Sequence, residues 1–332
     1  MSIDLRTSYL GLKLKNPLMP GASPLVDSLD QVKRLEDAGA AAVVMHSLFA
    51  EQIERDGQAW DRHAVRWENS FAEAESFLPQ AAGFSLGPDE YLARVARLKE
   101  VCSVPVIASL NGTRVGEWVG HAALIEQAGA DALELNTYFL ATDTEESGES
   151  LEERLLEVVR GVRERVDIPI AVKLSPYHTS VGHLVRRLEA VGAEGVVLFN
   201  RLFQPEIDVD VLEVRPKLEL STPEDLRLRL RWIGLLRDQV NVSLAGSGGV
   251  HAPADVVKLI LAGADAVQSV SALLRRGPQR LGDWLGDLRA WMEEHEYASV
   301  AEMKGALCMA RCPDPEAYER GNYLRTLQLW RE

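Results

Sequence analysis

The sequence predicts a (β/α)8 TIM barrel with an N-terminal β-hairpin plug and a C-terminal helical extension. Two observations predict it. A helical stretch ending in Ala/Val-Gly-Ala precedes a short apolar run four times, around Gly39, Gly129, Gly192 and Gly263. Apolar runs of a second kind alternate with these and end in polar or glycine-rich turns. Together they make eight strands separated by helices, which is the composition of this barrel.

The strands are rich in Val, Leu, Ile and Ala, as expected for strands buried on both faces. They are predicted near 17–22, 42–46, 104–110, 131–136, 168–174, 195–200, 240–246 and 264–269. Apolar residues at helical spacing occupy most of the intervals, for example 89–101, 116–128, 150–165 and 178–191. Each repeat glycine is the expected end of a helix, because a left-handed residue is least strained when it is glycine.

The spacing of the repeat glycines locates two insertions. These glycines lie 90, 63 and 71 residues apart, whereas two βα units of such a barrel take roughly 60 residues. The excess falls in 48–88, after the second strand, and in 201–230, after the sixth. Both are expected over the active face as lids or substrate walls. The second should also contain the helix EDLRLRLRWIGLL, whose arginines predict a solvated face; a patch for an acidic ligand is the alternative.

The chain on either side of the barrel has its own expected structure. LRTSYLGLKLKN is typical of a β-hairpin that turns at Gly11 and closes the bottom of the barrel. Residues 278–332 are expected to be helical and to pack on the barrel or on a partner subunit. No linker divides the chain, so we expect one domain over 1–332, with the barrel over about 16–275.

Composition excludes several classes of function. Hydrophobic residues make up 46% and charged residues 26% of the chain, which fits a globular protein with a large core. The formal net charge of −14 argues against binding to nucleic acid or to an anionic membrane. No apolar run reaches the ~18 residues of a membrane helix, and a signal peptide is not evident. Three cysteines suit the reducing cytoplasm.

The C-terminal strand ends carry the candidate site, because a parallel barrel presents them on one face. The residues at these ends are Ala22, Ser23, His46, Ser47, Asn111, Gly112, Asn136, Lys173, Asn200, Ser247, Gly248, Gly249, Ser269, Val270 and Ser271. Any one of them could be an ordinary cap or turn residue. Three Asn and one Lys at the mouth of one barrel nevertheless favour a ligand site.

Two of these loops predict a phosphate site. Gly248 and Gly249 follow the seventh strand and Ser271 follows the eighth, where barrels of this kind commonly bind phosphate. Lys173 ends an otherwise apolar strand, so it must reach water or an anion. A fixed cation there could stabilise a group that becomes anionic during a reaction. Flavin mononucleotide (FMN) fits this arrangement, with its ring across the barrel mouth and Lys173 near the N1/O2 edge.

The chain resembles the dihydroorotate dehydrogenase family, in particular its soluble class 1 branch, over about residues 9–275. The resemblance rests on LGLKLKNPLMPGAS, VVMHS, LELN, IPIAVKLSPY, VVLFN and SGGVHAPADVVKLILAGADAVQSVSAL. It implies an FMN-dependent oxidoreductase of pyrimidine biosynthesis that acts on dihydroorotate. It also implies that electrons pass to a soluble acceptor or a partner protein, since the membrane-associating helix of the quinone-linked branch is absent.

The resemblance also implies site residues. Those implied to line or contact the flavin and its phosphate are Ala22, Ser23, Asn136, Lys173, Asn200, Gly248, Gly249 and Ser271. Ser47 and Asn111, at neighbouring strand ends, are further candidates for flavin contact. For a small anionic substrate the candidate contacts are His46, Asn136, Asn200 and Arg201.

Four features depart from the family pattern. The family places a Cys or Ser base three residues after the Asn of the fourth strand, and here that residue is Phe139, which cannot accept a proton. His46 stands where a Lys is expected, and Arg201 where a small hydroxyl residue is expected. A glycine pair expected after the sixth strand is missing from 202–226. The resemblance therefore implies a retained cofactor site and a rebuilt substrate site.

The general base stays open. Replacement bases are Tyr138, His46 or a hydroxyl of TDTEESGES (142–150), and Phe139 as core filler with no base nearby is the other interpretation. Lys173 and Asn136 complete the set of candidate catalytic residues. No metal is expected: HExxH spacing is missing, and Cys308 and Cys312, four apart on a predicted helix, are more typical of core residues than of ligands.

Two other classes of function are also consistent with these residues. One is a flavin-free phosphate-binding barrel with isomerase or lyase activity, in which Lys173 forms a Schiff base or acts as an acid–base group. The other is the flavin subunit of a larger redox complex with little activity alone. A homodimer is expected, because barrels of this kind often pair.

Overall fold

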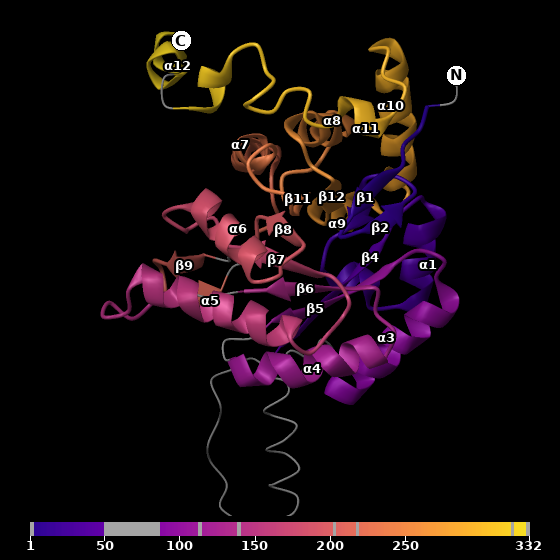
Figure 1. The fold of residues 1–332 in the computed structure, drawn as a ribbon, viewed down its shortest axis with the longest axis vertical. Helices are drawn as coiled ribbons and strands as arrows, with labels where there is room; N and C mark the ends of the chain where they lie inside the picture. Colours follow the sequence, from indigo (N-terminus) through magenta and orange to yellow (C-terminus); the bar gives the residue numbers. More distant parts are fainter. Residues whose placement is uncertain are drawn as a thin grey trace, which may run out of the picture.

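The predicted barrel is confirmed. The computed structural model describes residues 3–49, 87–111, 115–137, 141–201, 204–216, 219–319 and 322–329. Eight parallel strands form one sheet in the order β3-β12-β11-β8-β7-β6-β5-β4. The two ends of this sheet meet where Ala41 N donates to Leu18 O at 2.8 Å. Helices surround the strands on the outside (Figure 1).

The strands and helices follow the predicted order. The strands are β3 (Leu18–Pro20), β4 (Val43–Phe49), β5 (Val106–Asn111), β6 (Ala132–Asn136), β7 (Ile170–Leu174), β8 (Gly195–Leu198), β11 (Ser243–Ser247) and β12 (Ala266–Ser269). The helices are α1 (Leu29–Asp37), α3 (Pro88–Val101), α4 (Val115–Gln127), α5 (Gly148–Arg163), α6 (Val181–Ala190), α7 (Leu226–Leu236), α8 (Pro253–Ala262) and α9 (Ser271–Arg276). The repeat glycines all have positive φ, between +95° and +123°, as predicted for helix ends.

The N-terminal hairpin closes the bottom of the barrel, as predicted. It consists of β1 (Thr7–Tyr9) and β2 (Leu12–Leu14), which pair antiparallel. Its buried side chains pack inside the barrel against small residues at the strand starts, namely Ala132, Ala171, Ala245 and Ala266. A Cβ on Gly195 would lie 2.4 Å from Leu10 Cδ2. The small residues on these strands therefore leave the space that the hairpin side chains occupy.

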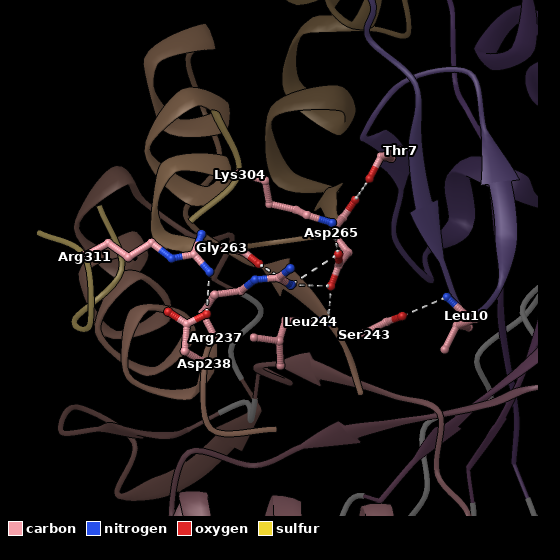
Figure 2. A network of polar contacts seen from close by, with 10 residues as sticks. All are labelled: Thr7, Leu10, Arg237, Asp238, Ser243, Leu244, Gly263, Asp265, Lys304 and Arg311. Carbon is pink, nitrogen blue, oxygen red and sulfur yellow. Dashed lines mark hydrogen bonds and ion pairs between the residues drawn. The ribbon is translucent and has the colours of Figure 1, made fainter. Parts of the chain in front are cut away.

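A network around Asp265 ties the hairpin, α7 and the C-terminal extension together (Figure 2). The Asp265 carboxylate accepts from Lys304 Nζ at 2.6 Å, from Arg237 Nη1 at 3.4 Å and from Leu244 N at 2.9 Å. Thr7 Oγ1 donates to the Asp265 carbonyl at 3.0 Å. These contacts join parts of the chain that are far apart in sequence.

The C-terminal extension is helical, with α10 (Arg280–Glu294), α11 (Val300–Met303), the 3-10 turn η3 (Pro315–Tyr318) and α12 (Asn322–Leu329). Both α10 and α11 pack against α8 (Figure 1). One prediction here is wrong: Cys308 and Cys312 lie in turns rather than on a helix. The helix ends because Lys304 has extended ψ and Gly305 has a φ of +75°.

The two predicted insertions differ from expectation. Strand β4 continues to Phe49, and most of 48–88 lies outside the described residues. The 201–230 segment contains the predicted helix α7, preceded by the 3-10 turn η2 (Pro223–Asp225), and also a hairpin of β9 (Pro205–Asp208) and β10 (Glu213–Pro216) that was not predicted. In the described part of the chain, these two strands pair only with each other. They are exposed, so the pattern of a buried strand is missing from their sequence.

Candidate active site

A chain of hydrogen bonds links polar residues from four strands at the barrel mouth. Ser109 Oγ on β5 lies 2.8 Å from Ser47 Oγ on β4. Asn136 Nδ2, at the end of β6, donates to Ser47 Oγ at 3.3 Å. Asn200 Nδ2, just after β8, donates to Asn136 Oδ1 at 2.7 Å, and Asn200 Oδ1 accepts from the Arg201 amide at 2.9 Å. The structure therefore brings Ser47, Asn136 and Asn200 together.

Ser109 was missed by the sequence reasoning. Strand β5 was interpreted as apolar up to its end, yet Ser109 and Asn111 are two residues apart and so lie on the same side of the strand. That alternation is the signal that could have found it. Asn111 is buried and is paired in register with Asn136.

Lys173 forms an ion pair with Glu134 inside the barrel. Its Nζ lies 3.2 Å from Glu134 Oε1, and the Glu134 side chain is 1% exposed. The second carboxylate oxygen accepts from Gln268 Nε2 at 2.6 Å, while Gln268 Oε1 is buried and has no hydrogen-bond partner among the residues that the structure describes. Glu134 was also missed, although it precedes Asn136 by two residues on β6 and therefore shares its inward side.

His46 is paired with an acid that the sequence did not single out. Its Nδ1 lies 2.5 Å from Asp27 Oδ1. Both atoms are buried, and among the described residues neither makes a hydrogen bond, so their close approach is an ion-pair contact without hydrogen-bond geometry. His46 was predicted at the end of its strand, and this is wrong. It lies within β4, where the register with β5 shifts between Val44 and Ser47.

The Tyr91 ring packs edge-on to His46, at 5.8 Å between ring centroids. It is held in place because its OH donates to Ser109 O at 3.0 Å and accepts from Ser109 N at 2.9 Å. Burial raises the pKa of Tyr91, so its hydroxyl stays protonated. Tyr91 therefore fixes one side of the imidazole without adding a charge.

The two glycine-loop residues predicted for phosphate have the backbone that such a loop needs. Gly248 and Gly249 have φ of +92° and +82°. A Cβ on Gly249 would lie 2.3 Å from Leu226 N, so no larger residue fits against α7. The Ser271 hydroxyl accepts from Ser221 N at 3.0 Å and from Ser221 Oγ at 2.8 Å.

Arg229 corrects the prediction of a solvated arginine face on α7. Arg227 and Arg231 are exposed as predicted, but Arg229 is 7% exposed. Its Nε donates to Ser247 O at 2.9 Å and its Nη1 to Asp225 O at 2.8 Å. Burial lowers the pKa of Arg229, and the nearby Asp225 carboxylate opposes this. Two main-chain carbonyls thus keep a cation inside the molecule directly behind the glycine loop.

A family profile described as dihydroorotate dehydrogenase matches residues 4–292. The chain belongs to the dihydroorotate dehydrogenase family. It is 28% identical over 314 residues to a protein of Methanothermobacter thermautotrophicus named dihydroorotate dehydrogenase B (NAD(+)), catalytic subunit, covering 92% of this chain and 99% of that protein. A protein of the same name from Pyrococcus abyssi is 30% identical over 316 residues, covering 91% of this chain and 98% of its own.

The residues that depart from the dihydroorotate dehydrogenase pattern lie in different surroundings. Arg201 is half-buried, and its Nη1 lies 3.3 Å from Asp225 Oδ2. Tyr138 and Phe139 lie outside the described residues. The hydroxyl residues of 142–150 are exposed. His46 is therefore the one replacement base for which the described structure supplies an acidic partner.

Ala22 and Ser23, which were predicted to line a flavin, follow β3. Ser23 is buried, and its hydroxyl donates to Gly21 O at 3.0 Å, while Ala22 is half-buried. Within the described ranges, no helix is long and apolar enough to cross a bilayer. In the same ranges, no group of three or more His, Cys, Asp or Glu could hold a metal ion.

Proposed function

We propose that this chain is an FMN-dependent oxidoreductase that transfers a hydride between a small anionic substrate and flavin N5, with dihydroorotate as the first candidate substrate. The observation that carries the proposal is the polar chain from Ser47 through Asn136 to Asn200, which lies at the strand ends with the Lys173–Glu134 pair beside it. Family membership supports the same reaction class. We also propose that residues 1–332 form one FMN-binding domain.

The residues fit FMN by three features. Gly248 and Gly249 have positive φ and lie so close to Arg229 and α7 that a Cβ would clash there, so the loop stays free of side chains, as a backbone phosphate site requires. Of the described residues, only Glu134 accepts from the Lys173 ammonium, so further N–H groups remain for a ligand. Gln268 Oε1 is buried, and no described residue donates a hydrogen bond to it. When bound, FMN would supply the hydride acceptor at its N5 atom.

The proposed roles of the residues follow from these positions. Gly248, Gly249 and Ser271 hold the phosphate, and Ala22, Ser23, Ser47 and Asn111 line the flavin. Asn136, Asn200 and Lys173 contact both flavin and substrate, where Lys173 stabilises negative charge. Arg201 binds the anionic group of the substrate, and His46 either shares this role or acts as the base described next.

The proton that leaves the substrate needs an acceptor other than Phe139. His46 is the proposed acceptor, because the Asp27 carboxylate lies beside its Nδ1 and would offset the positive charge that the imidazole gains when Nε2 takes the proton. Tyr138 and the hydroxyls of 142–150 remain alternatives.

The electron acceptor is proposed to be a soluble compound or a partner protein. The relatives carry the name of a catalytic subunit of an NAD(+) enzyme. This name favours, as a second candidate function, a flavin subunit that acts within a larger redox complex. Copurification of an iron–sulfur partner protein would favour that candidate, and a fully active isolated homodimer would count against it.

The absorption spectrum of the purified protein tests the proposal. A flavin spectrum, with FMN identified by mass spectrometry of the released ligand, is expected. A colourless protein that takes up no added FMN would refute it. Dihydroorotate is expected to bleach the bound flavin without oxygen; a bound flavin that stays oxidised would point to another substrate. Borohydride trapping of a substrate on Lys173 would instead favour the flavin-free isomerase or lyase.

A further inference from the structure

We propose that Arg229 is a positioning residue for a phosphate monoester. It orients the Gly248 N–H toward the phosphate and places a positive charge behind the loop that binds the phosphate. Arg229 thereby selects FMN over riboflavin. This inference rests on the proposed function, since FMN is the phosphate ester that the site would take. Nothing in the sequence pattern suggested it, because Arg229 was grouped there with its exposed neighbours.

The first argument is the charge of Arg229. No carboxylate of the described residues accepts from its guanidinium; its acceptors are the carbonyls of Ser247 and Asp225. The Asp225 carboxylate is instead 3.3 Å from Arg201 Nη1 and accepts from Thr222 N at 2.9 Å. A buried guanidinium without a contacting anion is costly. A bound dianion beside it would relieve that cost.

The second argument is the direction of the loop amide. The Ser247 carbonyl accepts from Arg229 Nε at 2.9 Å, on the side of α7, and also from Phe199 N at 3.2 Å, so Arg229 and the main chain after β8 together fix its direction. In a planar trans peptide the next N–H points the opposite way, so the Gly248 N–H is aimed away from α7. A hydrogen bond to the carbonyl from a cation also polarises the peptide and strengthens that N–H as a donor.

The third argument is closeness. The ideal Cβ position of Gly248 lies 2.9 Å from Arg229 Nη2. The guanidinium and the loop backbone are thus in direct contact, with no side chain between them. Gly248 has a φ of +92°, a conformation that favours glycine. The close contact with Arg229 therefore requires glycine at this position.

Binding of FMN and of riboflavin to the same apoprotein tests the inference, because the two ligands differ by the phosphate alone. The variant Arg229→Met is expected to weaken FMN binding by roughly tenfold to a hundredfold. Riboflavin binding is expected to change by less than about threefold. The exposed Arg231→Met on the same helix is the matched control and should leave both affinities unchanged.

The outcomes separate the possibilities. Equal weakening of both ligands would show a purely structural role and overturn the inference, as would no weakening at all. If Arg229→Met does not fold, Arg229→Lys is compared in the same way. Lysine keeps the charge but cannot make both hydrogen bonds to the carbonyls of Ser247 and Asp225. If the wild-type protein binds neither flavin, the proposed function fails. Thermal stabilisation by inorganic phosphate then decides: dependence on Arg229 supports the inference and independence overturns it.

Discussion

The ammonium of Lys173 and the carboxylate of Glu134 lie 3.2 Å apart inside the barrel, with 7% and 1% of their side chains exposed. Replacing either partner leaves the other as a buried charge without its counterion. Lys173→Met and Glu134→Gln are each expected to lower the free energy of unfolding by roughly 3–5 kcal/mol. The double variant should lose clearly less than the sum of the two. Urea unfolding of all four proteins measures the coupling, and additive losses would contradict a direct pair.

The Asp265 network predicts that the Asp265 carboxylate contributes more to the free energy of unfolding than the nearby Asp238 carboxylate. Asp265→Asn leaves Lys304 and Arg237 uncompensated, so we expect a loss of roughly 3 kcal/mol. Asp238→Asn, on the exposed Asp238 seen in Figure 2, should lose less than about 1 kcal/mol. Denaturant midpoints give the comparison, and equal losses would argue against the network as the link to the C-terminal extension.

Glu36 predicts a stability change at low pH. Burial acts to raise its pKa, but hydrogen bonds from Lys33 and Ser103 outweigh this and hold the pKa at about 2, below the ordinary 4.5. A lowered pKa stabilises the fold above the unfolded value, and this contribution disappears as the pH falls through about 2. Glu36→Gln should therefore lose roughly 1–3 kcal/mol at about pH 7. The gap to wild type should close progressively below about pH 4.5.

Denaturant unfolding over a series of pH values checks this expectation. The exposed Glu294→Gln is the control and should stay within about 0.5 kcal/mol of wild type throughout. A Glu36→Gln gap that persists unchanged in acid would show that packing, rather than charge, makes the difference.

The His46–Asp27 pair predicts which variants slow flavin reduction. His46→Gln should lower the rate of anaerobic flavin bleaching by roughly a hundredfold to ten-thousandfold if it takes the substrate proton. Asp27→Asn should have a smaller effect in the same direction, because the imidazole remains but loses the negative charge beside it. Tyr138→Phe should leave the rate near that of wild type. Stopped-flow absorbance measures all three, and a large loss in Tyr138→Phe alone would move the base to Tyr138.

The sequence determined the barrel because its signals are local. Apolar runs, helical spacing and glycines such as Gly39 and Gly263 each report on a few neighbouring residues, and their alternation predicts the order of strands. It also pointed to one face for the candidate site, since the ends of parallel strands share that face. Asn136, Asn200 and Ser47 could therefore be assigned together before any contact was known.

Only the tertiary structure decided which charges meet. Glu134 and Lys173 are 39 residues apart and become partners because β6 and β7 are neighbours in the sheet. Arg229 and Ser247 are 18 residues apart, and the arginine is buried because it lies on the inward face of α7 together with Leu226 and Ile233. Local sequence carries periodicity and backbone preference, whereas a buried charge is stabilised only by the partner that the closed barrel brings to it.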